Sequence, residues 1–189
     1  MPRRGVTRDR VVDAAAALVD AGGPEAVTLA AVADAVGIRT PSLYNHVEGL
    51  AGLRRDLAVH AVRQLGGALS AAADGAGEGE RVVALGRAYR GFALAHPGLH
   101  AMAVRAPEPD DAEHAAAAAE VVDVVIGALG DHGVGGTEAI HATRGLRSVL
   151  HGFAAIELGG GFGLDVDVDA SFEWVLGVFV AGLSARARG

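Results

Sequence analysis

Apolar residues near the start of the chain recur with the period of a helix. Over residues 8–21 they stand four, three and one positions apart, which places them on one helical face. Thr7 can cap this segment at its N-terminus, and Gly22 and Gly23 followed by Pro24 can end it. The chain therefore opens with an amphipathic helix whose inward residues are Val11, Ala15, Leu18 and Val19.

Two short amphipathic segments follow closely on each other. The first covers residues 29–36, with Thr28 at its N-cap, and Gly37 after it supplies the positive φ of a tight turn. The second covers residues 41–47, with Thr40 as its N-cap and a proline as its first residue, where the missing N–H costs nothing. The pattern predicts two short helices joined by a tight turn.

Longer helical segments fill the rest of the chain. The breaks between them carry Gly or Pro, as in the linker at residues 74–79. No segment alternates convincingly between apolar and polar residues as a half-buried strand does. We predict an all-α protein of about nine helices from this periodicity. The later helices are expected at residues 50–72, 80–95, 97–104, 110–129, 137–158 and 169–187.

Composition agrees with closely packed helices. Hydrophobic residues make up 51% of the chain and aromatic residues only 4%, so small side chains dominate the apolar content. The chain has no cysteine, which excludes disulfides and thiolate metal sites. The N-terminus has no apolar segment typical of a signal peptide, and the most apolar run, residues 174–185, is too short for a membrane span. We therefore expect a cytoplasmic protein with no membrane partner.

Charge is distributed unevenly along the chain. The net charge is −7, yet residues 1–55 hold seven arginines against six acidic residues, while residues 56–189 hold nine against seventeen. The acidic body would repel an anionic partner, and the near-neutral head, with Arg3 and Arg4 near its tip, would face such a partner. The chain has no lysine, so every basic phosphate contact must come from arginine.

The first three predicted helices form a helix-turn-helix, in which the second short helix enters the major groove of DNA. Its outward side chains near the N-terminus must be small or polar, as Thr40, Ser42 and Asn45 are. Tyr44 and His46 suit phosphate or sugar contacts, which set register without reading sequence. This segment is the predicted DNA-reading surface.

Residues 28–47, TLAAVADAVGIRTPSLYNHV, closely resemble the DNA-binding motif of the TetR family of repressors. The match extends over about residues 7–60. Its elements are the Thr28 cap, Ala33, the turn Val36-Gly37-Ile38, and Leu43-Tyr44-x-His46-Val47. The resemblance implies a homodimer that binds a palindromic double-stranded DNA operator, with contacts from Thr28, Arg39, Thr40, Pro41, Ser42, Tyr44, Asn45 and His46.

One position departs from the pattern of that family. Its members usually carry a lysine four residues after the histidine, and this lysine holds a phosphate. Here Leu50 stands at that position, and Arg54 and Arg55 follow one turn later. Either arginine replaces the contact, or the contact is lost and both lie on a solvated helix face.

The C-terminal part is expected to sense a ligand and to hold a dimer. His151-Gly152-Phe153, followed by Glu157 and a Gly-rich break, resembles the C-terminal domain of the WHG-type TetR subclass, although no tryptophan precedes the histidine. The predicted domains are residues 1–50, which bind DNA, and 51–189, which bind ligand and dimerise, with helix 50–72 linking them. Small residues in stripes along the last two helices predict the dimer face: Gly145, Ser148, Gly152, Ala155, Gly177, Ala181 and Ser184.

An effector pocket is expected among the middle helices, apolar with a few polar groups. Its candidate lining is Phe92, His96, His100, Met102, His151, Phe153 and Trp174, of which each is also compatible with ordinary core. We predict neither a metal nor a cofactor. His96 and His100 lack a third ligand, the run from Asp165 to Asp169 lacks the later positions of a calcium loop, and the glycines at 159–163 follow a helix rather than a strand.

These features predict a transcriptional repressor that a small-molecule ligand releases from its operator. A small-molecule-binding or interaction module that has the same fold but weak or lost DNA binding is the alternative, favoured by the acidic charge and Leu50. An enzyme is disfavoured because no pairing of a nucleophile with a base is visible. The effector, the operator sequence and the sign of regulation are left open.

Overall fold

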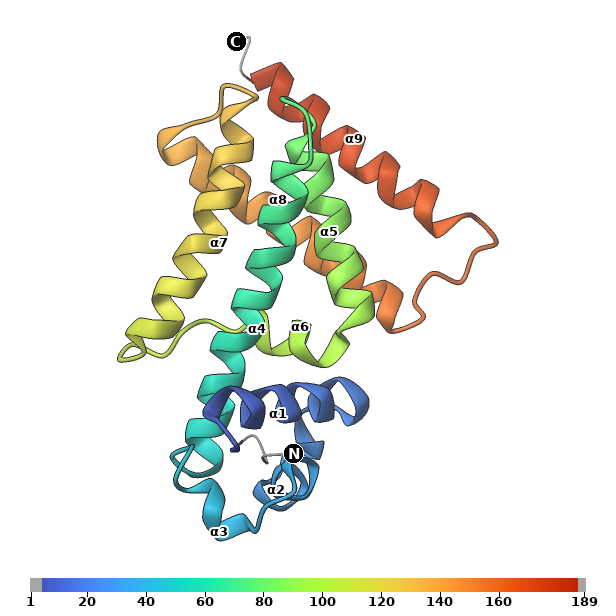
Figure 1. Cartoon of the computed structure of the whole chain (residues 1–189). Coiled ribbons are helices and arrows are strands. Elements are labelled where there is room, and N and C mark those ends of the chain that lie inside the picture. The colour runs from blue at the N-terminus through green and yellow to red at the C-terminus, as the bar shows by residue number, and fades with distance from the viewer. Residues whose placement is uncertain (1–4, 187–189) are drawn as a thin grey trace. The chain divides into compact units, whose positions relative to one another are not determined.

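The computed structural model describes residues 5–186 of the chain, so Arg3 and Arg4 lie outside the described residues. Over residues 5–186 the chain forms nine α-helices and one short 3-10 helix, and no strand, which confirms the predicted all-α fold (Figure 1). The six helices after residue 48 begin and end within two residues of their predicted bounds.

The helices divide into two compact units. The head unit consists of Met1–Gln64 and His96–Ala117, and the body unit of Leu65–Ala95 and Ala118–Gly189. Helix α4 runs from Gly49–Asp74 and contributes to both.

In the head unit, the first helix forms as predicted. Helix α1, Arg8–Gly22, begins at Thr7, whose Oγ1 accepts a hydrogen bond from the Arg10 amide at 3.3 Å. Its apolar stripe is buried, with Val11, Ala15 and Val19 at 0% exposure. The helix ends at Gly23, where φ is +74°, and a 3-10 turn, η1, Pro24–Ala26, follows. Packing of this stripe, rather than helix propensity, supplies most of the stability of such a helix.

The two short helices differ in how well the sequence predicted them. Helix α2, Leu29–Val36, has the predicted bounds, and Gly37 after it lies in the left-handed region at φ +74°. Helix α3 covers only Thr40–Leu43, so the predicted helix 41–47 is too long at its C-terminal end, and Arg39, not Thr40, occupies the N-cap. Beyond Leu43 the Asn45 and His46 amides donate to carbonyl oxygens three residues back and the Val47 amide to one four residues back, and Val47 still reaches the core at 5% exposure.

Helix α6, Pro97–Ala103, belongs to the head unit because it packs on α1. Asp20 of α1 accepts hydrogen bonds from the Leu99 amide at 2.9 Å and from Nδ1 of His96 at 2.8 Å. An ideal Cβ on Gly98 would lie 2.1 Å from the Val19 carbonyl oxygen, so the two backbones can approach this closely only at glycine. Helix α6 is thus joined to α1 by both hydrogen bonds and close packing.

In the body unit, α5, Arg81–Ala95, packs against both α8, Gly136–Leu158, and α9, Val168–Arg186 (Figure 1). Helix α7, Ala112–Gly130, begins in the head unit and continues into the body unit. The core of the body unit is made of fully buried side chains from four helices, among them Leu85, Leu129, Leu146, Phe172 and Leu176.

Arg90 of α5 fastens the end of α8 to the start of α9. Its guanidinium donates hydrogen bonds to both carboxylate oxygens of Glu157 and to Oδ1 of Asp169, all at 2.6 Å. It also lies over the Phe172 ring at 4.9 Å and the Phe153 ring at 5.7 Å. The Arg90 side chain is only 14% exposed, and the hydrogen bonds that it donates to Glu157 raise its pKa, so its charge is permanent.

Candidate nucleic-acid interface

The side chains predicted to touch DNA lie on the outer side of α2 and α3. Thr28 is exposed, and its Oγ1 caps α2 by accepting a hydrogen bond from the Ala31 amide at 3.1 Å. Tyr44, in the turn after α3, is 62% exposed. Of the other predicted contacts, Thr40 and His46 are half-buried, and Arg39, Pro41, Ser42 and Asn45 are exposed.

A hollow of about 390 Å³ lies where the turn after α3 meets the first turns of α4. Three of the predicted contacts, Tyr44, Asn45 and His46, line it together. The other five predicted contacts do not line it. We call this feature the α3–α4 hollow, and its remaining lining is Arg8, Val47, Glu48, Gly52, Arg55 and Asp56.

Two ion pairs occupy the charged side chains of the α3–α4 hollow. Arg8 donates from Nε and Nη2 to the two carboxylate oxygens of Asp56 at 2.9 and 2.5 Å. Hydrogen bonding to Asp56 raises the pKa of Arg8. Arg55 makes one contact, from Nη2 to Oε2 of Glu48 at 3.0 Å. The hollow therefore presents basic groups that are already paired.

Two of these arginines carried different signals in the sequence. Arg55 was one of two candidates for the missing phosphate contact, and the structure places it, rather than Arg54, in the α3–α4 hollow. Arg8 was seen only as the start of a helix, because its partner Asp56 lies 48 positions away. No local pattern relates residues that far apart.

Comparison with known proteins decides the family. A model described as "Bacterial regulatory proteins, tetR family" matches residues 11–47, and one described as "Tetracyclin repressor-like, C-terminal domain" matches residues 82–179. The HTH-type transcriptional regulator YobS of Bacillus subtilis is 34% identical over 96% of this chain and 95% of its own length. A second HTH-type transcriptional regulator, from Mycobacterium tuberculosis, is 32% identical over 96% of this chain and 83% of its own length.

The chain belongs to the TetR family. It is therefore a helix-turn-helix transcriptional regulator and not an enzyme. The TetR resemblance predicted from residues 28–47 is confirmed. The WHG-type subclass stays a prediction, because the matching C-terminal model is described only as tetracyclin repressor-like.

Solved structures share the fold of this TetR-family regulator. A protein of unknown function from Rhodococcus sp. RHA1 has a TM-score of 0.84 at 23% identity, covering 97% of this chain and 98% of its own. A TetR variant from Acinetobacter baumannii AYE, solved in complex with minocycline, has a TM-score of 0.70 at 20% identity, covering 97% and 99%. At these identities the likeness concerns the fold alone.

The predicted effector contacts of the regulator divide between the two units. His96, His100 and Met102 belong to the head unit, where His100 is 4% and Met102 5% exposed. In the body unit, Phe92 and Phe153 are buried and His151 is exposed. Trp174 is 70% exposed on α9, so within one chain it lines no interior. The structure also buries His114 of α7, and its Nε2 has no hydrogen-bond partner within residues 5–186.

The predicted dimer residues lie along one face of each of the last two helices. On α8, Ser148 and Ala155 are exposed and Gly145 and Gly152 are half-buried. On α9, Gly177 and Ala181 are exposed and Ser184 is half-buried. Trp174 is three residues before Gly177, on the same helical face. A Cβ added at Gly152 or Gly177 would meet no described atom within 4 Å, so packing within the chain does not account for these glycines.

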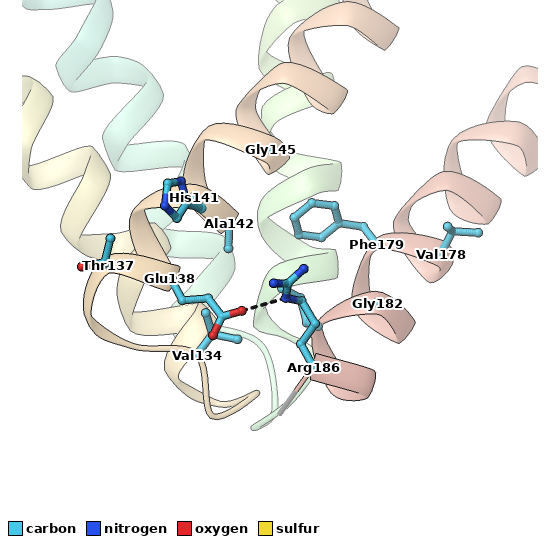
Figure 2. A pocket seen from close by; sticks show the side chains of 11 residues that line it. Val134, Thr137, Glu138, His141, Ala142, Gly145, Val178, Phe179, Gly182 and Arg186 are labelled. Carbon is cyan, nitrogen blue, oxygen red and sulfur yellow. Dashed lines mark hydrogen bonds and ion pairs between the residues drawn. The ribbon is translucent and has the colours of Figure 1, made fainter. Parts of the chain in front are cut away.

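An open groove of about 1050 Å³ runs between α8 and α9, and we call it the α8–α9 groove. Figure 2 shows Phe179 pointing from α9 toward α8. The groove is also lined by Arg186, whose Nε donates to Oε1 of Glu138 at 2.7 Å (Figure 2). The rest of its lining is Val134, Thr137, His141, Ala142, Gly145, Val178, Gly182 and Leu183.

Helix α9 is the one helix in the described part of the chain that is long and apolar enough to cross a membrane by length and composition. Only 17% of the most apolar stretch of α9 is buried within the chain.

Within residues 5–186, no group of three or more His, Cys, Asp or Glu side chains could hold a metal ion.

Proposed function

We propose that this regulator is a homodimeric repressor that binds a palindromic operator through its head unit and that a small-molecule ligand releases it. The observation that carries the proposal is the exposure of Tyr44 and Asn45 beside α3, within the residues 11–47 that match the tetR-family model. In functional terms, residues 1–50 serve as the DNA-binding domain and 51–189 as the ligand-binding and dimerisation domain, with α4 linking them.

The proposed division of labour among the DNA contacts follows their chemistry. Asn45 and the hydroxyls of Thr40 and Ser42 read base edges in the major groove. Tyr44 and His46 set register through phosphates or sugars. Three further residues, Thr28, Arg39 and Pro41, complete the contact surface at the N-terminal ends of α2 and α3.

We propose that a second copy covers the small-residue faces of α8 and α9 and the α8–α9 groove. The support is the open space at Gly152 and Gly177, together with exposed apolar side chains such as Trp174 and Val178 at 52%. In this proposal Trp174 belongs to the dimer face and not to the lining of the effector pocket. The same covering explains the apolar surface of α9 without a membrane, and the DNA partner implies a cytoplasmic location.

To release DNA, effector binding must change the conformation of the head unit. The minocycline complex of the Acinetobacter baumannii TetR variant supports a small molecule as the effector of this chain. Any ligand contact that shifts α6 shifts α1 with it, because Asp20 and the close approach at Gly98 join the two helices. Release then needs a ligand that binds the two conformations with different affinity.

A TetR fold with weak or lost DNA binding is the second candidate. It is favoured by Leu50 at the usual anchor position and by the carboxylate partners that Arg8 and Arg55 already have. Salt-dependent affinity for duplex DNA separates the two candidates, since each phosphate contact releases counterions.

A gel shift with duplex fragments from upstream of the protein's own gene tests the proposal. Tyr44→Ala and Asn45→Ala are expected to weaken binding, and Asn45→Ala also to relax sequence preference, since a bidentate base contact is worth about 1–3 kcal/mol. Glu120→Gln, exposed in the body unit, is the control and is expected to bind as the wild type does. If Tyr44→Ala and Asn45→Ala both left affinity and preference unchanged, the assignment of α3 would be wrong.

A further inference from the structure

We infer that Arg55 is the phosphate-binding side chain at the start of α4 and that Glu48 competes with DNA for it. The inference rests on the proposed DNA-binding function and names a residue that the family pattern does not supply, since Leu50 replaces the usual lysine. In the free protein Arg55 is held by Glu48, and on DNA a phosphate takes the place of the carboxylate.

The register of α4 selects Arg55 over Arg54. Gly52 and Arg55 stand three residues apart on one face of α4, and Glu48, just before the helix, accepts a hydrogen bond at its carbonyl oxygen from the Gly52 amide at 3.2 Å. All three line the α3–α4 hollow together with Tyr44 and Asn45. Arg54 points about 100° away around the helix and does not line that hollow. Of Arg54 and Arg55, therefore, Arg55 is the one that lies beside the side chains proposed to contact DNA.

Gly52 leaves room for the competing carboxylate. A Cβ added at Gly52 would lie 2.8 Å from the Cβ of Glu48, closer than side chains tolerate. Without that Cβ, the Glu48 side chain lies against the first turn of α4 and its Oε2 comes within 3.0 Å of Nη2 of Arg55. The glycine thus contributes to the pairing that holds Arg55 inside the hollow.

The two ion pairs of the hollow differ in how easily they exchange. Arg8 makes two hydrogen bonds to Asp56, whose side chain is 9% exposed, and it also lies 3.9 Å from Glu113. Arg55 makes one hydrogen bond to Glu48, and these side chains are 52% and 84% exposed. Water screens and solvates the second pair, so the interaction is weak. Arg55 can therefore exchange Glu48 for another anion readily.

A phosphate is a suitable replacement for the Glu48 carboxylate. Both groups are anions whose oxygens accept hydrogen bonds from a guanidinium in the same geometry. Arg8 stays on Asp56 and supports the start of α1, while Arg55 turns to the DNA. The displaced Glu48 then adds a negative charge near the phosphate, so it opposes DNA binding in two ways.

Fluorescence anisotropy with a fluorescein-labelled duplex from upstream of the protein's own gene, and with an unrelated duplex of equal length, tests the inference. Arg55→Ala is expected to weaken binding about tenfold on both duplexes and to lower the slope of log affinity against log salt by about one. Arg54→Ala is the matched control, expected to stay within about twofold. Glu48→Gln is expected to tighten binding several-fold, and this gain is expected to shrink strongly in the Arg55→Ala background.

The outcomes separate the inference from the function on which it rests. If Asn45→Ala weakens binding but Arg55→Ala does not, or if Arg54→Ala costs more than Arg55→Ala, the inference is overturned and DNA binding stands. An undiminished gain from Glu48→Gln in the Arg55→Ala background would overturn the competition between Glu48 and DNA for Arg55. If the wild type shows no salt-dependent binding to either duplex, the proposed function and the inference both fail.

Discussion

The α3–α4 hollow of the head unit and the α8–α9 surface of the body unit, by which we mean the small-residue faces of α8 and α9 together with the α8–α9 groove, expose opposite chemistry. The hollow gathers charged side chains that are already paired, as in Arg8 with Asp56 and Arg55 with Glu48. The α8–α9 surface carries small and apolar residues that nothing within residues 5–186 covers, of which Trp174 is the most exposed aromatic at 70%. Charged side chains that are already paired suit a partner that binds reversibly, whereas an uncovered apolar surface suits a permanent partner.

The largest effect is expected at the small-residue face of α8. Gly152→Glu places a carboxylate where a second copy is proposed to pack closely, and an unpaired buried charge there would dissociate the dimer. Light scattering should then show a monomer, and DNA affinity should fall about a hundredfold or more as bivalent binding is lost. Gly91→Glu, at an exposed and open position on α5, is the control. A Gly152→Glu protein that remains dimeric would place the interface elsewhere.

A large loss of stability is expected at the α1–α6 contact of the head unit. Gly98→Ala forces a Cβ to within 2.1 Å of the Val19 carbonyl oxygen, and backbone must move to relieve the clash. We expect a destabilisation of about 3 kcal/mol from this overpacking, measured by urea unfolding. Gly91→Ala meets no atom and should be neutral or stabilising. Equal stability of the two variants would mean that α1 and α6 are not held this closely.

A smaller loss is expected at Arg90 in the body unit. Arg90→Leu removes three hydrogen bonds and leaves Glu157, 18% exposed, without its partner. Hydrogen bonds to charged groups support an estimate of about 2 kcal/mol. Because Arg90 joins the end of α8 to the start of α9, the dimer should also weaken, as sedimentation of a dilution series would reveal. Loss of stability with an unchanged dimer constant would limit Arg90 to a role inside one chain.

The smallest effect is expected at Asp131, and it depends on pH. The hydrogen bond from Arg81 lowers the pKa of Asp131 to about 2, from an ordinary value of 3.8. A carboxylate with a lowered pKa stabilises the fold above its ordinary pKa, and this contribution is lost as the pH falls through the folded value. Asp131→Asn should therefore lower Tm at pH 7, with the difference from wild type disappearing between about pH 4 and pH 2. A difference that does not vary with pH would contradict the assignment.

The sequence predicted best those features that depend on neighbouring residues. The caps at Thr7 and Thr28 and the left-handed turn at Gly37 are local, and the structure contains all three. The end of α3 was predicted wrongly, because the turns after Leu43 depend on how Val47 reaches the core. Local pattern therefore located the recognition motif but not the detailed path of its backbone.

Side-chain pairing and burial that depend on tertiary structure escaped prediction in both regions. Asp56 and Glu48 accept hydrogen bonds from the two arginines of the α3–α4 hollow. No sequence pattern marked either acid as a partner of an arginine. The burial of His114 was equally invisible, since it is one polar residue in an alanine-rich segment. Trp174 was a candidate for the lining of an apolar pocket, and the structure exposes it at 70%. In the proposed dimer a second copy covers it.

The most direct test of a dimer that reads DNA is the stoichiometry and salt dependence of its complex. Sedimentation velocity with a labelled duplex from upstream of the protein's own gene measures both in one titration. We predict two chains per bound duplex, an affinity that falls steeply with salt, and loss of sequence preference in Asn45→Ala. A dimer that binds no duplex at low salt, or that binds with equal affinity and preference after Asn45→Ala, would contradict the account.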